Sequence, residues 1–167
     1  MKTLTIIWHS RTGAARQLAR AMAEGARDAA QQMQAQLQIR ELPAEQATLK
    51  ELLQADGLLF CAPENLASLS GEMKAFFDRH YYPVGDALAG RPYGIAISAG
   101  TDGAGAARQT ERICTGWRLR LCAAPLIVRN GAQTPQAILA PKTLDETARA
   151  QAQELGGLLA ATLLLAA

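Results

Sequence analysis

Five short segments of the chain have the hydrophobic pattern of β-strands. Three of them are continuously apolar, which is typical of strands covered by helices on both faces. One segment alternates apolar and polar residues and another contains a proline, Pro125, and both features indicate strands at the edge of a sheet. In chain order the five segments span residues 4–8, 36–40, 57–62, 93–97 and 121–128.

Apolar residues recur at helical spacing between these segments, which predicts five amphipathic helices. Pro83 and Gly85 are expected to end the third helix, and Gly116 the fourth. Thr143 followed three residues later by Glu146 has the form of a capping box, which predicts the start of the last helix. In chain order the helices cover residues 14–33, 48–54, 71–80, the segment up to 116 and the segment from 143.

Strands and helices therefore alternate along the whole chain. Such alternation predicts a doubly wound α/β fold, in which a parallel five-stranded sheet carries helices on both faces and the crossovers are right-handed. The sequence contains no repeat, low-complexity tract or linker that would mark a second domain. We therefore expect residues 1–167 to form a single domain.

Charge and cysteine usage narrow the range of partners and compartments. The 17 basic and 15 acidic residues leave a net charge of +2, too little for the broad field that attracts nucleic acid or an anionic membrane. The apolar runs at the two ends are too short for a signal peptide or a membrane span, which needs about twenty residues. Cys61, Cys114 and Cys122 form no Cys-x-x-Cys pair and lie in apolar stretches, so we expect buried free thiols in a reducing, cytoplasmic setting.

The loop after the first strand has the composition of an anion site. In open parallel sheets ligands bind outside the carboxyl ends of the strands, where the strand order reverses. Ser10, Thr12 and Gly13 lie between the first strand and a helix N-terminus, where free backbone N–H groups and the helix dipole favour an anion. Arg11 and Arg16 add positive charge. The alternative is a simple helix cap by Thr12, with both arginines in solvent.

This loop contains neither the glycine-lysine motif that wraps a triphosphate nor the three-glycine motif of dinucleotide folds, so a monophosphate fits better. It resembles the phosphate loop of flavodoxin-like proteins, which bind FMN through a Ser/Thr-x-Thr-Gly-x-Thr pattern. Ser10 and Thr12 match, whereas alanines replace the third hydroxyl and a common asparagine; backbone donors remain at both positions. The resemblance implies a flavodoxin-like fold with FMN bound by Ser10, Arg11, Thr12, Gly13, Ala14 and Ala15.

A second loop, PENLASLSGEMKAFFDR after the third strand, is similar to the corresponding segment of flavodoxin-like NAD(P)H-dependent FMN and quinone reductases. In that family the first half of the segment borders the flavin ring. The glycine-rich loop SAGTDGAG resembles the family's other ring-side loop in length and glycine content, although a flexible strand-to-helix connection is the alternative. The implied ring contacts are Pro63, Glu64, Asn65, Leu66, Ala67, Ser98, Gly100, Thr101 and Asp102.

The resemblance implies an FMN-binding oxidoreductase that transfers electrons from NAD(P)H to a quinone, flavin or similar small acceptor. Because the flavin carries the redox chemistry, we expect no catalytic side chain, and the sequence shows no metal-ligand constellation. A flavodoxin-like electron carrier without NAD(P)H turnover and a relative that has lost its flavin are the alternatives. A homodimer or higher homo-oligomer is implied by the resemblance alone.

Overall fold

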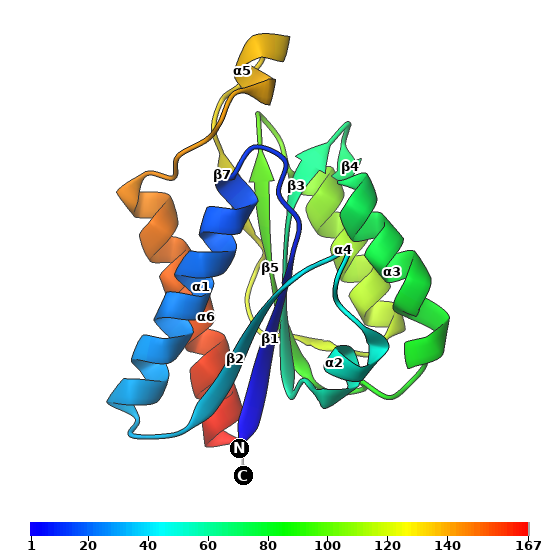
Figure 1. Ribbon diagram of the computed structural model, residues 1–167, viewed down its shortest axis with the longest axis vertical. Coiled ribbons are helices and arrows are strands. Elements are labelled where there is room, and N and C mark those ends of the chain that lie inside the picture. Colours follow the sequence, from blue (N-terminus) through cyan, green and yellow to red (C-terminus); the bar gives the residue numbers. More distant parts are fainter. Residues whose placement is uncertain (167) are drawn as a thin grey trace.

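A parallel β-sheet runs through the middle of the molecule in the order β2-β1-β3-β5, and β6 and β7 pair with the outer edge of β5 (Figure 1). The computed structural model describes residues 1–166, which contain seven strands and six helices. The strands are β1 (Lys2–Trp8), β2 (Leu37–Pro43), β3 (Gly57–Asn65), β4 (Ser68–Leu69), β5 (Pro92–Ala99), β6 (Arg120–Leu121) and β7 (Leu126–Arg129). The helices are α1 (Ala14–Gln32), α2 (Leu49–Gln54), α3 (Gly71–Val84), α4 (Ala104–Gly116), α5 (Pro135–Leu139) and α6 (Glu146–Leu165).

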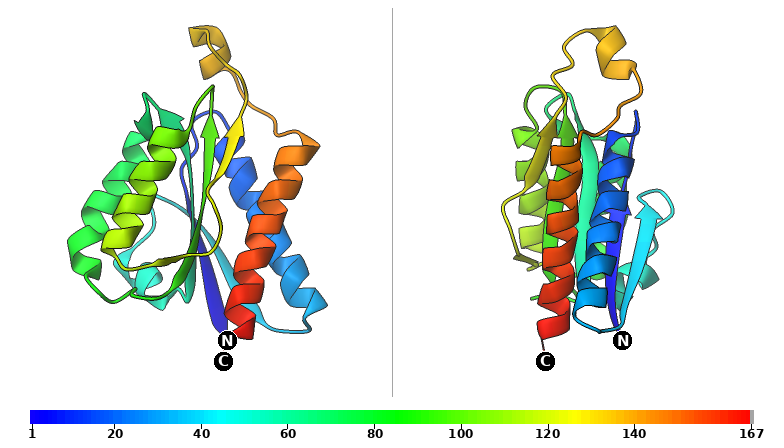
Figure 2. Two further views of the ribbon diagram at one scale, coloured as in Figure 1. Left: turned by 180° about the vertical axis from the view of Figure 1, so that it is seen from behind. Right: turned by 90° about the vertical axis from the view of Figure 1, so that its left-hand side faces the viewer.

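Helices cover both faces of this sheet. The helices α1 and α6 lie on one face, and α2, α3 and α4 lie on the other (Figures 1 and 2). When β6 and β7 are counted as one interrupted strand, the strand order is that of flavodoxin-like folds. The flavodoxin-like α/β fold predicted from the sequence is therefore confirmed.

The predicted fifth strand is split into two pieces. It forms β6 and β7, and the residues between them leave the sheet around Pro125. Proline has no backbone N–H to donate to a neighbouring strand, so the ladder is interrupted where the edge tolerates it best. The prediction of one continuous strand was wrong, whereas its edge position and the half-exposed edge position of β2 are confirmed.

The additional strand β4 arises from a hairpin that the sequence pattern did not indicate. The pairs Glu64–Leu69 and Asn65–Ser68 are antiparallel, and a two-residue turn joins them. Leu66 and Ala67 form this turn with φ angles of +51° and +61°. Such turns usually contain glycine or asparagine, so the Leu-Ala pair concealed the hairpin.

Two predicted helix ends differ from the structure. Pro83 lies inside the last turn of α3, where it removes only one internal hydrogen bond, and the helix ends at Val84 instead of His80. The helix α6 begins at Glu146, because the Asp145 side chain accepts the N–H of Ala148 at 2.7 Å and acts as the N-cap. The predicted capping box at Thr143 was therefore wrong.

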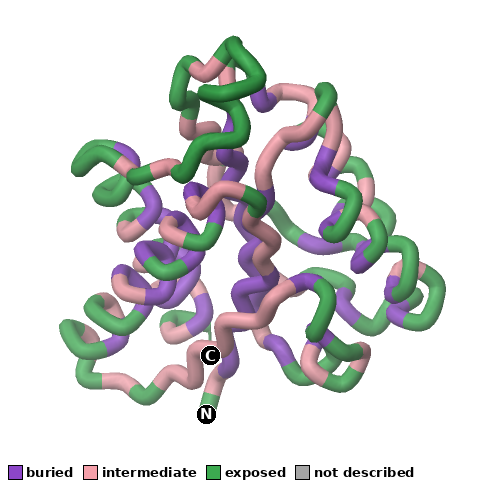
Figure 3. Tube along the Cα trace, turned by 45° about the horizontal axis from the view of Figure 1, so that its top comes forward, coloured by how far each residue is buried: buried purple, intermediate pink, exposed green. Residues whose placement is uncertain are grey.

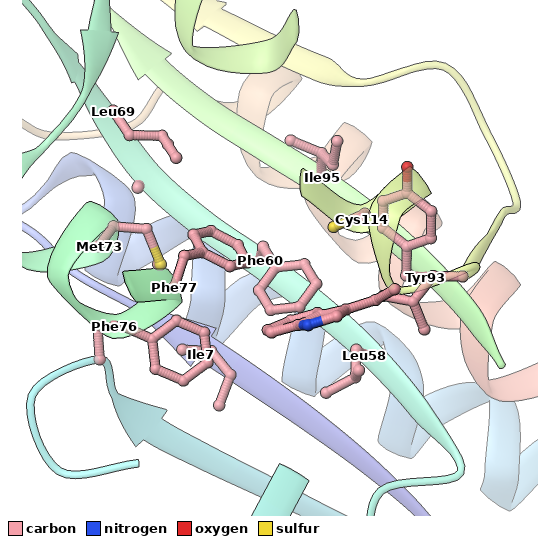
Figure 4. Close-up of a cluster of buried hydrophobic side chains, with 14 of the residues drawn as sticks. Ile7, Leu58, Phe60, Leu69, Met73, Phe76, Phe77, Tyr93, Ile95 and Cys114 are labelled. Atoms are coloured by element: carbon pink, nitrogen blue, oxygen red, sulfur yellow. The ribbon is translucent and has the colours of Figure 1, made fainter. Parts of the chain in front are cut away.

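Two hydrophobic cores lie on opposite faces of the sheet. Leu58 and Phe60 of β3 point into the core under α3 and α4, and Leu59 and Cys61 of the same strand point into the core under α1 and α6. Figure 4 shows the first core, where Phe60, Phe76, Phe77 and Tyr93 pack around one another, with ring centroids of Phe60 and Phe77 5.1 Å apart. Buried residues are concentrated in the strands and on the inner sides of the helices (Figure 3).

No helix within residues 1–166 is long and apolar enough to cross a membrane.

Candidate cofactor site

The three loops singled out in the sequence meet at the carboxyl ends of β1, β3 and β5. They line a cavity of about 270 Å³ that is open to solvent. A cavity of about 410 Å³ at the opposite edge lies at the amino ends of the strands, where open parallel sheets rarely bind ligands. The predicted residues that line the smaller cavity are Arg11, Thr12, Pro63, Glu64, Asn65, Leu66, Ser98, Gly100 and Thr101.

The candidate phosphate loop leaves the N-terminus of α1 open. The loop is closed by Ser10, whose hydroxyl oxygen accepts the N–H of Gly13 at 3.1 Å, and Gly13 adopts a φ of +99°. Within residues 1–166 no side chain caps α1, so the first N–H groups of the helix remain available. Free N–H groups at the positive end of a helix dipole are the donor set that a phosphate requires. The loop therefore fits the phosphate of FMN although Ala14 and Ala15 supply no hydroxyl.

The two arginines of this loop have different surroundings. Arg11 is exposed and lines the cavity. Arg16 instead lies over the indole ring of Trp8, with its guanidinium carbon 5.7 Å from the ring centroid. A cation placed over an aromatic face is held there by the ring quadrupole. Only Arg11 of this pair is therefore placed to offset the charge of a ligand in the cavity.

Glu64 holds the two ring-side loops together. Its carboxylate accepts the N–H of Gly103 at 2.8 Å and the N–H of Ala106 at 3.2 Å, so it caps the N-terminus of α4. Gly105 completes this junction, because a Cβ at that position would overlap the carbonyl oxygen of Ala67. Both carboxylate oxygens thus have protein donors, which indicates that Glu64 positions the loops in addition to lining the cavity.

The turn between β3 and β4 places an apolar side chain at the edge of the cavity. Leu66 is fully exposed and lines the cavity from this turn. A left-handed backbone is unfavourable for a residue with a branched side chain, and such conformations cluster at functional sites. Asn65 and Pro63 line the same side, and Pro63 pairs with Ser98 across β3 and β5.

Several predicted contacts lie outside this cavity. Ala14 lines an adjoining cavity of about 250 Å³, which shares Ser98, Asn130 and Lys142 with the first. Asp102 accepts the N–H of Ala104 at 3.1 Å and so serves the turn before α4. The remaining predicted residues that line neither cavity are Ser10, Gly13, Ala15 and Ala67.

Residues after β7 complete the cavity, and the sequence analysis missed them. They belong to the segment 130–144, which we call the arm and which includes α5. Thr134 before Pro135 is a helix-start signal that would have revealed α5, since Thr134 caps the helix and Pro135 occupies its first turn. No pattern in the sequence indicated that α5 lies over the cavity. The additional lining residues are Asn130, Ala132, Ile138 and Lys142 of the arm, together with Ala99 at the end of β5.

The cysteine next to the site is a core residue. Burial raises the pKa of the Cys61 thiol far above its ordinary value, and Sγ donates to the carbonyl oxygen of Ala15 at 3.1 Å. The protonated thiol therefore packs beneath the first turn of α1 and is a poor nucleophile. Cys114 is likewise buried, whereas Cys122 is partly exposed, which differs from the expectation for that residue.

Comparison with known sequences shows which proteins this chain resembles. A family described as "NADPH-dependent FMN reductase" matches residues 1–128. A probable NAD(P)H dehydrogenase (quinone) of Arabidopsis thaliana is 40% identical over 76 residues, which cover 45% of this chain and 27% of that protein. A flavodoxin of Aquifex aeolicus is 35% identical over 78 residues, which cover 47% of this chain and 40% of the flavodoxin. The matches thus span less than half the length of these relatives.

Comparison with solved structures supports the fold. A flavodoxin from the domain Archaea superposes with a TM-score of 0.74 at 14% identity, over 97% of this chain and 99% of the flavodoxin. At this identity the similarity concerns the fold alone.

Proposed function

Because the chain belongs to the NADPH-dependent FMN reductase family, we propose that its cavity binds FMN and that the protein transfers electrons from NAD(P)H to a quinone, flavin or similar small acceptor. The observation that carries the proposal is the uncapped N-terminus of α1, which opens beside a cavity lined by all three predicted loops. The family match covers those three loops, since it extends from residue 1 to residue 128.

In this proposal the chain itself binds and orients. The N–H groups of the first turn of α1, with the hydroxyl of Thr12, hold the phosphate, and Arg11 offsets its charge. Ser10 shapes the loop through its hydrogen bond to Gly13. The other two loops border the ring through Pro63, Glu64, Asn65, Leu66, Ser98, Gly100 and Thr101. FMN supplies the redox chemistry when it is bound. Overall, NAD(P)H, one proton and a quinone give NAD(P)⁺ and a hydroquinone, and solvent at the open cavity supplies the proton.

A fluorescence titration tests cofactor binding first. When purified protein is added to FMN, the flavin fluorescence should fall and level off at one FMN per chain. Flavin fluorescence that stays unchanged in the presence of excess protein contradicts the proposal and favours a family relative without flavin.

Oxidation of NADPH in the presence of a naphthoquinone then tests turnover. We expect loss of NADPH absorbance that requires FMN, the quinone and the protein together. The similarity to the flavodoxin of Aquifex aeolicus favours an electron carrier as the second candidate. A carrier predicts FMN binding without NADPH oxidation, so the two functions are separated by this assay.

The compartment and the oligomeric state belong to the same proposal. We propose a reducing, cytoplasmic setting, which is supported by three free thiols within the described chain. We also propose a homodimer or higher homo-oligomer, on the strength of the family resemblance, and sedimentation of the FMN-loaded protein tests it.

A further inference from the structure

The arm stands over the candidate cofactor cavity and is attached to two of its loops (Figures 1 and 2). At its start, the N–H groups of Asn130 and Gly131 donate to the carbonyl oxygens of Ala99 and Gly100 at 3.0 and 2.8 Å. At its end, the N–H of Lys142 donates to the carbonyl oxygen of Thr12 at 2.8 Å. The arm also lies beyond residue 128, where the family match ends. This wall of the cavity is thus a feature that the family match does not describe.

The arm holds a defined shape although little of it is buried. None of the five residues of α5 is buried, and a helix this short is not stable alone. The Lys142 ammonium donates to the carbonyl oxygens of Ala137 and Ile138 at 2.6 and 3.1 Å, which satisfies the C-terminal end of α5. The Gln17 side chain of α1 donates to the carbonyl oxygen of Lys142 at 2.7 Å. The position of α5 relative to the cavity is therefore fixed by hydrogen bonds.

Two exposed aliphatic side chains line the cavity from opposite loops. Leu66 extends from the strained turn between β3 and β4, and Ile138, which is 48% exposed, extends from α5. Exposed apolar side chains that converge on one cavity indicate a ligand contact. Leu139 is also exposed but does not line the cavity, so apolar exposure on α5 alone does not place a residue at the site.

The size of the cavity decides what these side chains can contact. At about 270 Å³ it lies at the lower limit of small-molecule sites, so a bound flavin leaves no room for a second substrate inside. An electron acceptor therefore has to approach the flavin from the solvent side, where Leu66 and Ile138 are exposed aliphatic side chains of the lining. Contact with aliphatic side chains favours a flat acceptor that is only weakly hydrated, because removing its water costs little free energy.

We propose that Leu66 and Ile138 form an apolar entrance that selects flat, apolar acceptors of the quinone class over small hydrophilic ones. The inference rests on the proposed function, since it concerns the acceptor that the flavin would reduce. The arm contributes one side of this entrance and so acts as a specificity element.

The test compares two acceptors in FMN-loaded full-length protein. The apolar acceptor is 2-methyl-1,4-naphthoquinone and the hydrophilic one is ferricyanide. The variants are Leu66→Asn, which suits the left-handed turn, and Ile138→Gln, which suits a helix. Leu139→Gln is the matched control, because it makes the same change one residue further along α5. Titration calorimetry of the naphthoquinone with the oxidised protein gives a readout that does not depend on turnover.

We expect the double variant to lower the ratio of kcat/KM for the naphthoquinone to that for ferricyanide about tenfold, with a matching loss of naphthoquinone affinity. The Leu139→Gln ratio should stay within twofold of wild type. A double variant with the wild-type ratio and wild-type affinity overturns the inference while the proposed function stands. A wild-type protein that binds no FMN overturns both.

Discussion

Thr12 contributes twice to the candidate site. It lines the cavity, and its carbonyl oxygen anchors the end of the arm. Its neighbour Ser10 closes the loop by a hydrogen bond to Gly13. The loop is therefore shaped by Ser10 and Gly13, while Thr12 and the N–H groups of α1 face the proposed ligand.

A carboxylate at position 12 tests the phosphate contact directly. Thr12→Glu places a negative charge beside the proposed phosphate, and we expect FMN affinity to fall about 100-fold, from roughly 3 kcal/mol of repulsion in a partly hydrated site. Thr115→Glu, on the exposed last turn of α4, is the control and should leave the affinity within twofold. Fluorescence titration with FMN measures both. Equal affinities in wild type and Thr12→Glu would remove the basis for the phosphate site.

His80 makes the stability of the protein sensitive to acid. It is 8% exposed, and its pKa is lowered below the ordinary 6.5, chiefly by burial and also by Arg79, although a hydrogen bond to the carbonyl oxygen of Ala47 opposes the shift. The unfolded chain therefore binds a proton at a higher pH than the folded one. The stabilisation is fully present above pH 6.5 and is lost as the pH falls towards the lowered pKa.

Urea unfolding at pH 7.5 and 5.5 checks this sign. We expect wild type to lose more unfolding free energy on acidification than His80→Gln, which keeps a donor for Ala47 but does not titrate. The comparison of the two proteins cancels the contributions of other titrating groups. An equal loss in both would show that His80 does not carry the effect.

The hairpin formed by β3 and β4 is strained at its turn. Ala67 has a φ of +61°, where glycine is favoured by about 1–2 kcal/mol over residues with a Cβ. Glycine also loses more entropy on folding, so Ala67→Gly should raise the free energy of unfolding by a net of about 0.5–1 kcal/mol. Ala75→Gly in the exposed middle of α3 should lower it by about 1 kcal/mol. Urea unfolding of both variants measures these opposite changes in the free energy of unfolding. A decrease in both variants would contradict the turn geometry.

The helices α1 and α6 pack backbone to backbone. A Cβ at Gly156 would overlap the carbonyl oxygen of Met22, and a Cβ at Gly25 would overlap that of Gln153. The two helices therefore approach each other through glycines on both sides. The adjacent Gly157 has more space, since its Cβ would lie 3.4 Å from the carbonyl oxygen of Gly25.

This difference gives a matched pair of substitutions in one helix. Gly156→Ala should destabilise the protein by about 2–3 kcal/mol, because the helices have to separate. Gly157→Ala should be neutral or stabilising by up to about 1 kcal/mol, because alanine has the higher helix propensity. Thermal and urea unfolding measure both changes. A Gly156→Ala variant as stable as Gly157→Ala would show that α1 and α6 lie further apart than described.

The two cores of the molecule share one sheet. Alternate residues of β3 point into opposite cores, so unfolding of β3 disrupts both cores at once. For this reason we propose that residues 1–167 fold as one cooperative domain.

Two tryptophans report on the two cores separately. Trp117 is buried in the core under α3 and α4, and Trp8 packs against the core under α1 and α6. The variants Trp8→Phe and Trp117→Phe each keep one tryptophan. In each variant, the urea midpoint measured by the fluorescence of that tryptophan should equal the midpoint measured by far-ultraviolet circular dichroism. Separate midpoints within one variant would indicate that the cores unfold independently.

The candidate site was only partly predictable from its residues. Loops that follow strands in a parallel sheet meet at one edge whatever their sequence, so Arg11, Pro63 and Ser98 were expected at one cavity and line it. The roles of Glu64 and Arg16 were not predictable. Glu64 accepts hydrogen bonds from Gly103 and Ala106, and Arg16 lies over the Trp8 ring. Both arrangements are set by how the segments pack in the folded chain.

The hydrophobic pattern alone determined the α/β class, the alternation of elements and the edge position of β2, because strand and helix periods are local properties of the chain. Pro125 indicated the edge position of the last strand. The tertiary structure decided where the arm lies over the cavity and which loops Glu64 joins. The position of the arm depends on contacts between residues far apart in the sequence, such as Lys142 with Thr12. Such contacts leave no periodic signal, since only the folded chain brings their partners together.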